Sequence, residues 1–129
     1  MPAEPPPLTV FLADDSGPIR LRVAAMLGGR AIEVVGEAVT PQGSIDGILA
    51  TRPDVVVLDV QLEGGSGLQV LQAVRAAAPG ISFVVFSNNS GPAYRKRFLD
   101  AGAFRFLDKS TEFDQLVPAV EAAALHTIA

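Results

Sequence analysis

Short apolar segments alternate with longer amphipathic segments five times along the chain. The apolar segments cover residues 8–13, 32–38, 55–58, 81–86 and 104–107. The run Val55-Val56-Val57-Leu58 and the run Phe83-Val84-Val85-Phe86 contain no polar residue, which is typical of parallel strands covered on both faces. We therefore predict five strands, each followed by a helix.

Polar caps, prolines and glycines mark where these helices begin and end. The starts predicted in this way lie at Ser16, Thr40-Pro41, Ser66 and Gly91-Pro92. The fifth helix is expected to be capped near Ser110 or Thr111, and Pro118 should delay its start or kink it, because proline cannot donate a helical hydrogen bond.

Five strand-helix units with short connections predict an α/β fold with a doubly wound parallel sheet, because parallel neighbours need helical crossovers of one hand. Residues 1–7 include the run Glu4-Pro5-Pro6-Pro7, which can neither form a helix nor join a central strand. We expect residues 1–7 to be a flexible proline-rich tail and residues 8–129 to be one domain.

Composition narrows the classes of function. The chain has no cysteine, which suits a reducing cytoplasm, and no apolar run approaches the roughly 18 residues that would span a bilayer. Its formal net charge of -4 disfavours attraction to phosphate backbones. We expect a cytoplasmic domain with protein partners, without membrane insertion, and with nucleic acid an improbable partner.

Chemistry-bearing residues follow the predicted strands. In a doubly wound sheet, ligands bind beyond the carboxyl ends of the strands. At those ends stand Asp14-Asp15, Asp59, Ser87, Asp108 and Lys109. Each alone is compatible with a turn, a helix cap or a solvated charge, but their joint placement at successive strand ends favours one shared site.

Three carboxylates at close quarters repel one another by roughly 4 kcal/mol per pair at an effective dielectric constant of about 20, so a cation is needed among them. Mg²⁺ prefers such oxygen ligands. With Asp14, Asp15 and Asp59 against Mg²⁺ and Lys109 the charges cancel, and the site could admit an anionic phosphoryl donor. Attack by the Asp59 carboxylate on phosphorus would give an acyl phosphate, with Ser87 as a donor to the added charge.

These residues also carry a family resemblance. Leu12-Ala13-Asp14-Asp15, Val57-Leu58-Asp59, Phe86-Ser87 and the run from Gly102 to Lys109 together resemble the response-regulator receiver domain of bacterial two-component systems over essentially the whole chain. The resemblance implies the flavodoxin-like, CheY-like (βα)5 fold, with strand order 2-1-3-4-5.

It also implies a metal site. Asp15 would bind Mg²⁺, or alternatively Mn²⁺, directly, Asp14 would act through water, and Asp59 would be both ligand and phosphoacceptor. The backbone carbonyl of Gln61 would be the third protein ligand.

Further roles follow from the same resemblance. Ser87 and Lys109 would contact the phosphoryl oxygens, and Phe106 would turn inward on activation. Gln61 and Asn89 would flank the attacking water and so set the lifetime of the phosphoryl group. Because both carry neutral amides, we expect an intermediate or long lifetime.

The resemblance implies a signalling switch rather than a turnover enzyme. A sensor histidine kinase or a histidine phosphotransfer protein would supply the phosphoryl group, and a downstream protein or a second receiver would bind the surface of the fourth helix, fifth strand and fifth helix. We expect this surface to expose the basic cluster Arg95-Lys96-Arg97, with Tyr94 and Phe98 turning part of the helix to the core.

Three alternatives stay open. The chain could be the receiver part of a longer DNA-binding transcriptional regulator, or a pseudo-receiver that works without phosphate. A phosphohydrolase with an aspartate nucleophile is disfavoured, because Gln61 stands where its second aspartate would be.

The sequence also departs from the family pattern. Ser110 replaces a proline that often follows the lysine with a cis bond, and we expect no such rigid turn. Glu63 replaces another proline, and the glycine-rich run 64–67 predicts a flexible loop.

Overall fold

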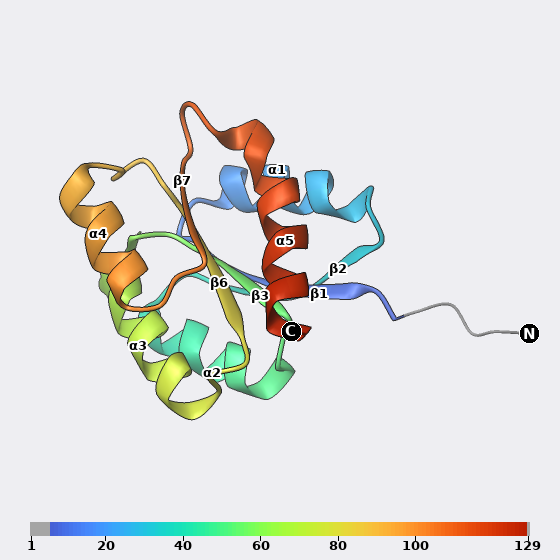
Figure 1. Ribbon diagram of the computed structural model, residues 1–129, viewed down its shortest axis with the longest axis horizontal. Helices are drawn as coiled ribbons and strands as arrows, with labels where there is room; N and C mark the ends of the chain where they lie inside the picture. The colour runs from blue at the N-terminus through green and yellow to red at the C-terminus, as the bar shows by residue number, and fades with distance from the viewer. Residues whose placement is uncertain (1–5, 129) are drawn as a thin grey trace, which may run out of the picture.

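The computed structural model describes residues 6–128 and contains a central five-stranded sheet (Figure 1). Its strands are β1 (Leu8–Ala13), β2 (Ile32–Ala38), β3 (Val55–Leu58), β6 (Ser82–Ser87) and β7 (Arg105–Asp108). The strand order is β2-β1-β3-β6-β7, and every neighbouring pair is parallel. Counted along the chain, this is the predicted order 2-1-3-4-5, so the predicted fold is confirmed.

The last two strands end one residue later than the apolar pattern predicts. Ser87 at the end of β6 pairs with Asp108 at the end of β7. Both residues are polar, yet they belong to the ladder, because main-chain hydrogen bonds continue a strand whatever the side chain. The later ends place a polar side chain, Ser87 or Asp108, at the last position of β6 and of β7.

Five helices cover the two faces of the sheet. They are α1 (Gly17–Gly28), α2 (Pro41–Thr51), α3 (Gly67–Ala77), α4 (Pro92–Asp100) and α5 (Leu116–Ile128). Figure 1 shows α1 and α5 on one face and α2, α3 and α4 on the other. Along β1, Val10 and Leu12 pack under the first pair while Phe11 and Ala13 pack under the other three. Burial on both faces explains the uninterrupted apolar strands.

The first three helices begin at the predicted caps. The side chains of Ser16, Thr40 and Ser66 each accept a hydrogen bond from a main-chain N–H in the first helical turn. Such bonds satisfy donors that would otherwise have no partner at the start of a helix.

The fifth helix begins later than its predicted cap near Ser110 or Thr111. A single 3₁₀ turn, η1 (Phe113–Gln115), precedes α5, and Pro118 lies in the first turn of α5, where its missing N–H costs nothing. Phe113 anchors η1, because its ring packs edge-on against that of Phe86, with 4.9 Å between the ring centroids. The guanidinium carbon of Arg22 also lies over the Phe113 ring, 3.7 Å from its centroid.

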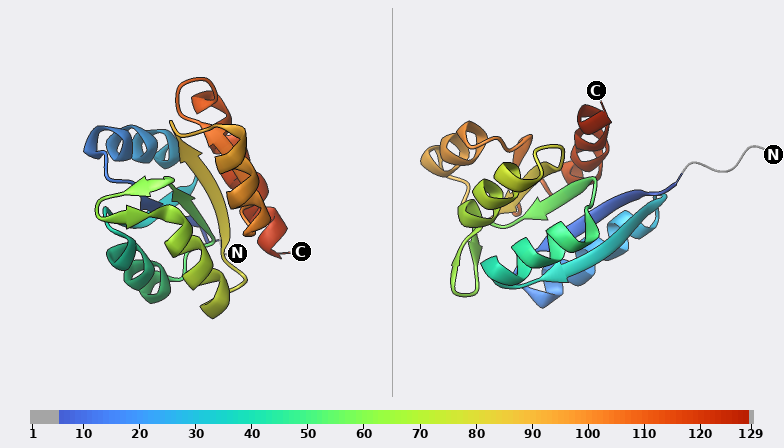
Figure 2. Two further views of the ribbon diagram at one scale, coloured as in Figure 1. Left: turned by 90° about the vertical axis from the view of Figure 1, so that its left-hand side faces the viewer. Right: turned by 90° about the horizontal axis from the view of Figure 1, so that it is seen from below.

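The glycine-rich run is more ordered than predicted. Residues Gln61–Leu62 (β4) and Gly65–Ser66 (β5) pair antiparallel as a short hairpin instead of a flexible loop. Its two-residue turn has Gly64 at a φ of 84°, a conformation that glycine adopts without steric cost. Figure 2 (right) shows the hairpin at the end of the domain opposite the start of β1.

Helix α4 lies differently from the prediction. Phe98 is buried, but Tyr94 is 46% exposed and does not turn to the core. Arg95 is not part of an outward basic cluster, because its guanidinium reaches the backbone of β7, where it binds the carbonyl of Phe106 at 3.0 Å. Lys96 and Arg97 are exposed as expected.

Most of the predicted tail, residues 1–7, lies outside the described residues, and the described Pro6 and Pro7 are exposed and precede β1. In the described part of the chain, no helix combines the length and apolar character needed to cross a membrane. The Lys109–Ser110 peptide bond is trans, as are all described peptide bonds.

Candidate functional site

Three carboxylates meet where β1 and β3 end. The two strands are paired so that Ala13 lies beside Leu58, and the residues that follow, Asp14 and Asp59, are therefore neighbours. Ligand oxygens of Asp14, Asp15 and Asp59 all lie within 4.8 Å of one another. Asp14 and Asp59 are buried, whereas Asp15 is exposed. The predicted convergence of these carboxylates is present.

Lys109 reaches this cluster from the end of β7, two strands away from β3. Its ammonium Nζ lies 2.7 Å from Asp14 Oδ2 and 2.8 Å from Asp59 Oδ2. Burial alone would lower the pKa of Lys109, but its bonds to the two carboxylates raise it overall. Lys109 is therefore a fixed positive charge shared between two buried aspartates.

Ser87 occupies the other oxygen of Asp59. Its hydroxyl donates to Asp59 Oδ1 at 2.6 Å and accepts a hydrogen bond from the main-chain N–H of Asn89 at 3.1 Å. The two oxygens of Asp59 thus have different donors, a neutral hydroxyl and an ammonium. The side chain of Asn89 is exposed beside this loop.

The donor set fits a divalent cation. Three carboxylates and one ammonium leave a formal charge of -2 in a small volume, which one Mg²⁺ or Mn²⁺ would neutralise. Burial raises the pKa of Asp14, despite its bonds to Lys109 and to the N–H of Ser16. Ionised Asp14 is therefore under-compensated by the protein alone, as expected of a ligand for a hard cation.

Gly67 lets the chain pass close to Asp59. A Cβ atom at position 67 would lie 2.0 Å from the carbonyl oxygen of Asp59, which no side chain could tolerate without backbone movement. The N–H of Gly67 donates to the carbonyl of Val60 at 2.7 Å and closes the connection around β4 and β5. In that hairpin the side-chain amide of Gln61 donates to the carbonyl of Gly65 at 3.2 Å.

Phe106 is already buried. Its ring is 4% exposed, lies 6.0 Å from the ring of Phe98 in an edge-to-face arrangement, and has the guanidinium of Arg95 5.2 Å from its centroid. The inward orientation expected on activation is thus the one in this structure. A change of orientation on phosphorylation stays a prediction.

Sequence reasoning missed Arg20, which lies one turn into α1. Its Nη1 donates to the carbonyl of Asp14 at 2.7 Å, and its Nε pairs with Glu37 at 2.9 Å. Arg20 thus ties the turn that carries two carboxylates to the end of β2. The signal available in the sequence was only an arginine after a helix cap, which is usually a solvated charge.

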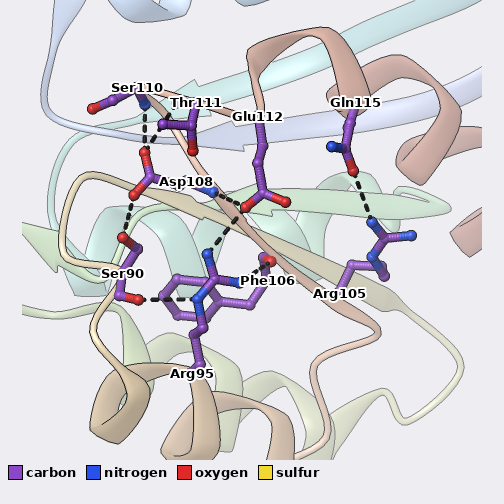
Figure 3. Close-up of polar contacts among 9 residues, drawn as sticks. All are labelled: Ser90, Arg95, Arg105, Phe106, Asp108, Ser110, Thr111, Glu112 and Gln115. Carbon is purple, nitrogen blue, oxygen red and sulfur yellow. Dashed lines mark hydrogen bonds and ion pairs between the residues drawn. The ribbon is translucent and has the colours of Figure 1, made fainter.

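A second missed group surrounds Asp108 (Figure 3). It joins the loop before α4 to the turn before η1 through the following residues: Ser90, Arg95, Phe106, Asp108, Ser110, Thr111 and Glu112. Nothing in the one-dimensional pattern connects residues near 90 with residues near 110, because β6 and β7 become neighbours only in the folded sheet.

Comparison with known proteins agrees with this geometry. The family model of the response regulator receiver domain matches residues 10–121 of this chain. The transcriptional regulatory protein PdtaR of Mycobacterium tuberculosis is 31% identical over 119 residues, which cover 91% of this chain and 57% of that protein. The DNA-binding transcriptional activator EvgA of Escherichia coli is 26% identical over 116 residues, again 57% of its length.

Among solved structures, the receiver domain of a NarL response regulator from Mycobacterium tuberculosis is 32% identical. It superposes with a TM-score of 0.86 and covers 93% of this chain and 98% of that one. The chain spans little more than half of the curated relatives but nearly all of this isolated receiver. The chain therefore belongs to the response regulator receiver domain family of two-component systems.

Proposed function

We propose that Asp59 accepts a phosphoryl group from a histidine kinase or a histidine phosphotransfer protein, and that the chain then signals through protein contacts. The observation that carries this proposal is the environment of Asp59. One of its oxygens binds the Ser87 hydroxyl, the other binds Lys109, and two further carboxylates stand beside it. A buried carboxylate that served only structure would not need two additional carboxylates at one edge.

In the proposed transfer, an oxygen of Asp59 attacks phosphorus in line with the nitrogen of a phosphohistidine. The P–N bond breaks, its electron pair stays on the imidazole nitrogen, and that nitrogen takes up a proton. The product is an acyl phosphate on Asp59. Lys109 and Ser87, which already contact the Asp59 oxygens, are placed to move onto the phosphoryl oxygens.

The residues that would hold Mg²⁺ or Mn²⁺ are Asp14, Asp15, Asp59 and the carbonyl of Gln61. A bound divalent cation supplies neutralisation of charge on the phosphoryl oxygens. The protein's own part is to hold the carboxylates together, and Lys109 and Arg20 do this from two sides. Self-phosphorylation and dephosphorylation, without turnover of another substrate, complete the proposed activity.

The lifetime of the acyl phosphate is proposed to depend on Gln61 and Asn89. Both side chains are neutral amides, so neither provides a carboxylate base for water; the Gln61 amide donates to the carbonyl of Gly65, and Asn89 is exposed. We expect the phosphorylated protein to persist for longer than about a second at neutral pH, because an amide orients water but does not take its proton. Quenched samples resolved by mass would follow the decay.

A second possibility for the output has its own observation. The relatives PdtaR and EvgA are named as transcription regulators, and this chain matches 57% of each. If the chain is the receiver part of such a regulator, the direct partner of its output surface is an attached DNA-binding domain. Either way the receiver surface acts by protein contact, through α4, β7 and α5.

Intact-mass measurement tests the proposal directly. The protein is incubated with acetyl phosphate, with and without Mg²⁺, and compared with Asp59→Asn under the same conditions. We expect the parent to gain the mass of one phosphoryl group only with the metal, and Asp59→Asn to gain none. A parent that stays unlabelled would instead be a pseudo-receiver, and a labelled Asp59→Asn would mean that another residue is the acceptor.

Asp15→Ala tests the metal assignment separately. Asp15 is exposed and is the carboxylate of the three for which no bond to Lys109 is found. Its removal should weaken Mg²⁺ binding, and with it the rate of labelling, because one charged oxygen ligand is lost. Isothermal titration calorimetry measures the Mg²⁺ affinity of the parent and of Asp15→Ala. An unchanged affinity in the variant would remove Asp15 from the ligand set.

A further inference from the structure

We propose that Asp108 is a positioning residue for phosphoryl transfer, which holds Ser87 and Lys109 in place around Asp59 through the loop that follows Ser87 and the turn that follows Lys109. This inference rests on the proposed function, because it concerns the same site. Asp108 does not touch Asp59. It acts from the outer side of β7, next in sequence to Lys109.

The Asp108 carboxylate fixes the turn after β7. Its Oδ1 accepts hydrogen bonds from the main-chain N–H groups of Ser110 at 2.6 Å and Thr111 at 3.2 Å. Such a side-chain turn holds the backbone on the C-terminal side of Lys109. On the N-terminal side Lys109 is held by the ladder, in which its N–H donates to the carbonyl of Ser87 at 3.1 Å.

The other oxygen of Asp108 reaches the loop between β6 and α4. Asp108 Oδ2 accepts a hydrogen bond from the hydroxyl of Ser90, three residues after Ser87 (Figure 3). A further contact between the same two loops runs from the hydroxyl of Ser110 to the side-chain oxygen of Asn88 at 3.2 Å. The loop after Ser87 and the turn after Lys109 are therefore joined to each other outside the sheet.

Arg95 and Glu112 complete the group. Arg95 donates to the carbonyl of Ser90 at 2.9 Å and to Glu112 Oε1 at 3.0 Å, while the same Glu112 oxygen accepts from the N–H of Asp108 at 3.0 Å. These contacts close a ring from Asp108 through Ser90, Arg95 and Glu112 back to Asp108. The ring gives Asp108 one orientation, with a carboxylate oxygen directed at each loop.

The charge state supports this arrangement. The hydrogen bond from the Ser90 hydroxyl, with those from the turn, lowers the pKa of Asp108. Its carboxylate therefore stays ionised and accepts all three bonds throughout the pH range in which Asp59 would act. Ser87 and Lys109, the residues from which the loop and the turn lead, hold different oxygens of Asp59, so a relative shift of these two segments changes both contacts together.

Three variants separate the functions of the two Asp108 oxygens. Ser90→Ala removes the contact that Asp108 makes with the loop after β6 and leaves the turn at Ser110 intact. Asp108→Ala removes both, and Asp108→Asn keeps an oxygen for the turn while its amide can donate to the Ser90 hydroxyl. Asp100→Ala is the matched control, because Asp100 is an exposed aspartate on α4 that pairs only locally with Lys96.

The experiment measures labelling of each folded variant by acetyl phosphate across a range of Mg²⁺ concentrations, well below its melting temperature. We expect labelling at saturating Mg²⁺ to fall about tenfold in Asp108→Ala and by less in Ser90→Ala, since small misplacement of catalytic groups is costly. The Mg²⁺ concentration for half-maximal rate should stay unchanged, and Asp108→Asn should recover most of the rate. A purely structural role would change the melting temperature but not this rate.

The outcomes are distinct. If the parent is labelled and Ser90→Ala and Asp108→Ala are labelled at its rate, as Asp100→Ala should be, the positioning role is wrong while the proposed function stands. If Asp108→Ala changes the Mg²⁺ dependence instead of the saturated rate, Asp108 acts on the metal site and the inference is equally wrong. If the parent itself is not labelled under any condition, the proposed function fails and this inference fails with it.

Discussion

At the scale of single residues, the site is defined by how Lys109 divides its charge. Its ammonium contacts both Asp14 and Asp59, so each carboxylate has only a share of one positive charge. Asp14 is buried and its pKa is raised, whereas the pKa of Lys109 is raised by the bonds to its two partners. The protein thus holds an acidic pair that is stabilised in part and that a divalent cation would complete.

The raised pKa of Asp14 predicts an unusual dependence of stability on pH in the metal-free protein. A raised carboxyl pKa means that the folded state favours the protonated form, so this contribution is present at low pH and is lost as pH rises through the raised value. Between the ordinary value of 3.8 and neutral pH, acidification should therefore relieve the cost of burying ionised Asp14. The raised pKa of Lys109 contributes stability that is fully present below its ordinary 10.5 and is lost only as pH rises through the raised value.

Urea denaturation with a chelator at about pH 7 and about pH 5 measures this contribution. We expect Asp14→Asn to remove the component of the pH dependence that favours low pH, while Asp46→Asn, on the exposed surface of α2, should retain it. Asp108 and Glu112 have lowered pKa values, so their contributions are lost only as pH falls below their ordinary 3.8 and 4.5. An identical pH dependence in parent and Asp14→Asn would contradict the assignment.

Gly67 gives a second prediction at this scale. Gly67→Ala should lower the free energy of unfolding by about 1–3 kcal/mol, because its Cβ would meet the carbonyl oxygen of Asp59 at 2.0 Å and force the backbone apart. Gly80→Ala is the control, since a Cβ there meets no atom within 4 Å. Urea denaturation compares the two. Equal stability of both variants would show that the connection after β3 moves without cost.

At the scale of elements, α4 is attached to the sheet by few contacts. Phe98 is its buried residue, and Arg95 bonds from its first turn to Ser90, Phe106 and Glu112. The Arg95 guanidinium lies over the Phe106 ring, and the Phe98 ring packs edge-on against it, so both side chains hold Phe106 in its buried position. The side of α4 that faces the sheet thus carries the Arg95 guanidinium as well as the Phe98 ring, whereas Tyr94 is exposed, and the hydrophobic pattern assigned both Arg95 and Tyr94 wrongly.

We predict that Arg95→Ala destabilises the protein and Arg97→Ala does not. Loss of the three Arg95 hydrogen bonds should lower the free energy of unfolding by about 1–2 kcal/mol. Hydrogen bonds from a charged donor are worth more than neutral ones, but the Arg95–Glu112 ion pair is partly exposed to solvent, which weakens it. Arg97 is exposed on the same helix and should change stability by less than about 0.5 kcal/mol. Urea denaturation checks both, and similar values would mean that α4 is held by Phe98 alone.

The contacts of Arg95 decide which residues can test the output surface. Reversing the charge of Arg95 would disrupt the contacts of β7 and the loop before η1, so any loss of association would be ambiguous. Arg97, together with the exposed Tyr94 and Leu99, is the appropriate probe of the α4 surface. Variants at these positions leave the polar group around Asp108 intact.

At the scale of the whole molecule, the acidic site and the surface expected to signal lie in different parts of the sheet. The chemistry lies at the carboxyl edge of the sheet, between β1, β3, β6 and β7, while α4, β7 and α5 form the surface expected to signal. The polar group around Asp108 joins the loop after β6, the turn after β7 and the first turn of α4 (Figure 3). Its position allows a change at Ser87 and Lys109 to reach α4.

A phosphoryl mimic should stabilise the folded protein as a whole. Mg²⁺ with beryllofluoride, at about 100 times its dissociation constant, should add about 2.7 kcal/mol to the free energy of unfolding, because it binds the folded state only. Differential scanning calorimetry should show a higher melting temperature for the parent and no shift for Asp59→Asn. A shift of equal size in both would place the mimic away from Asp59.

The same complex tests the output. If sedimentation with Mg²⁺ and beryllofluoride shows self-association, we expect Arg97→Glu to weaken it, because the substitution reverses an exposed charge on α4. Phosphorylation-dependent capture of a target then distinguishes a second receiver from a different partner. Parent and Arg97→Glu that associate equally in both assays would place the output surface elsewhere.

The sequence by itself determined the fold and the main site. Uninterrupted apolar runs such as Val55–Leu58 require burial on both faces, and short connections between parallel strands favour a doubly wound sheet, while the strand order was implied by the family resemblance. Caps at Ser16, Thr40 and Ser66 depend on a few adjacent residues, which is why they were predictable. The acidic cluster followed because residues after parallel strands must meet at one edge.

Only the tertiary structure decided which polar side chains pair across that edge. Asp108 meets Ser90, and Arg95 meets Glu112, because β6 and β7 lie side by side and their loops face each other. Arg20 likewise contacts both Asp14 and Glu37, because the ends of β1 and β2 lie side by side in the sheet. Such contacts depend on side-chain direction and on distances between segments far apart in sequence, and local propensity and periodicity carry no information about either.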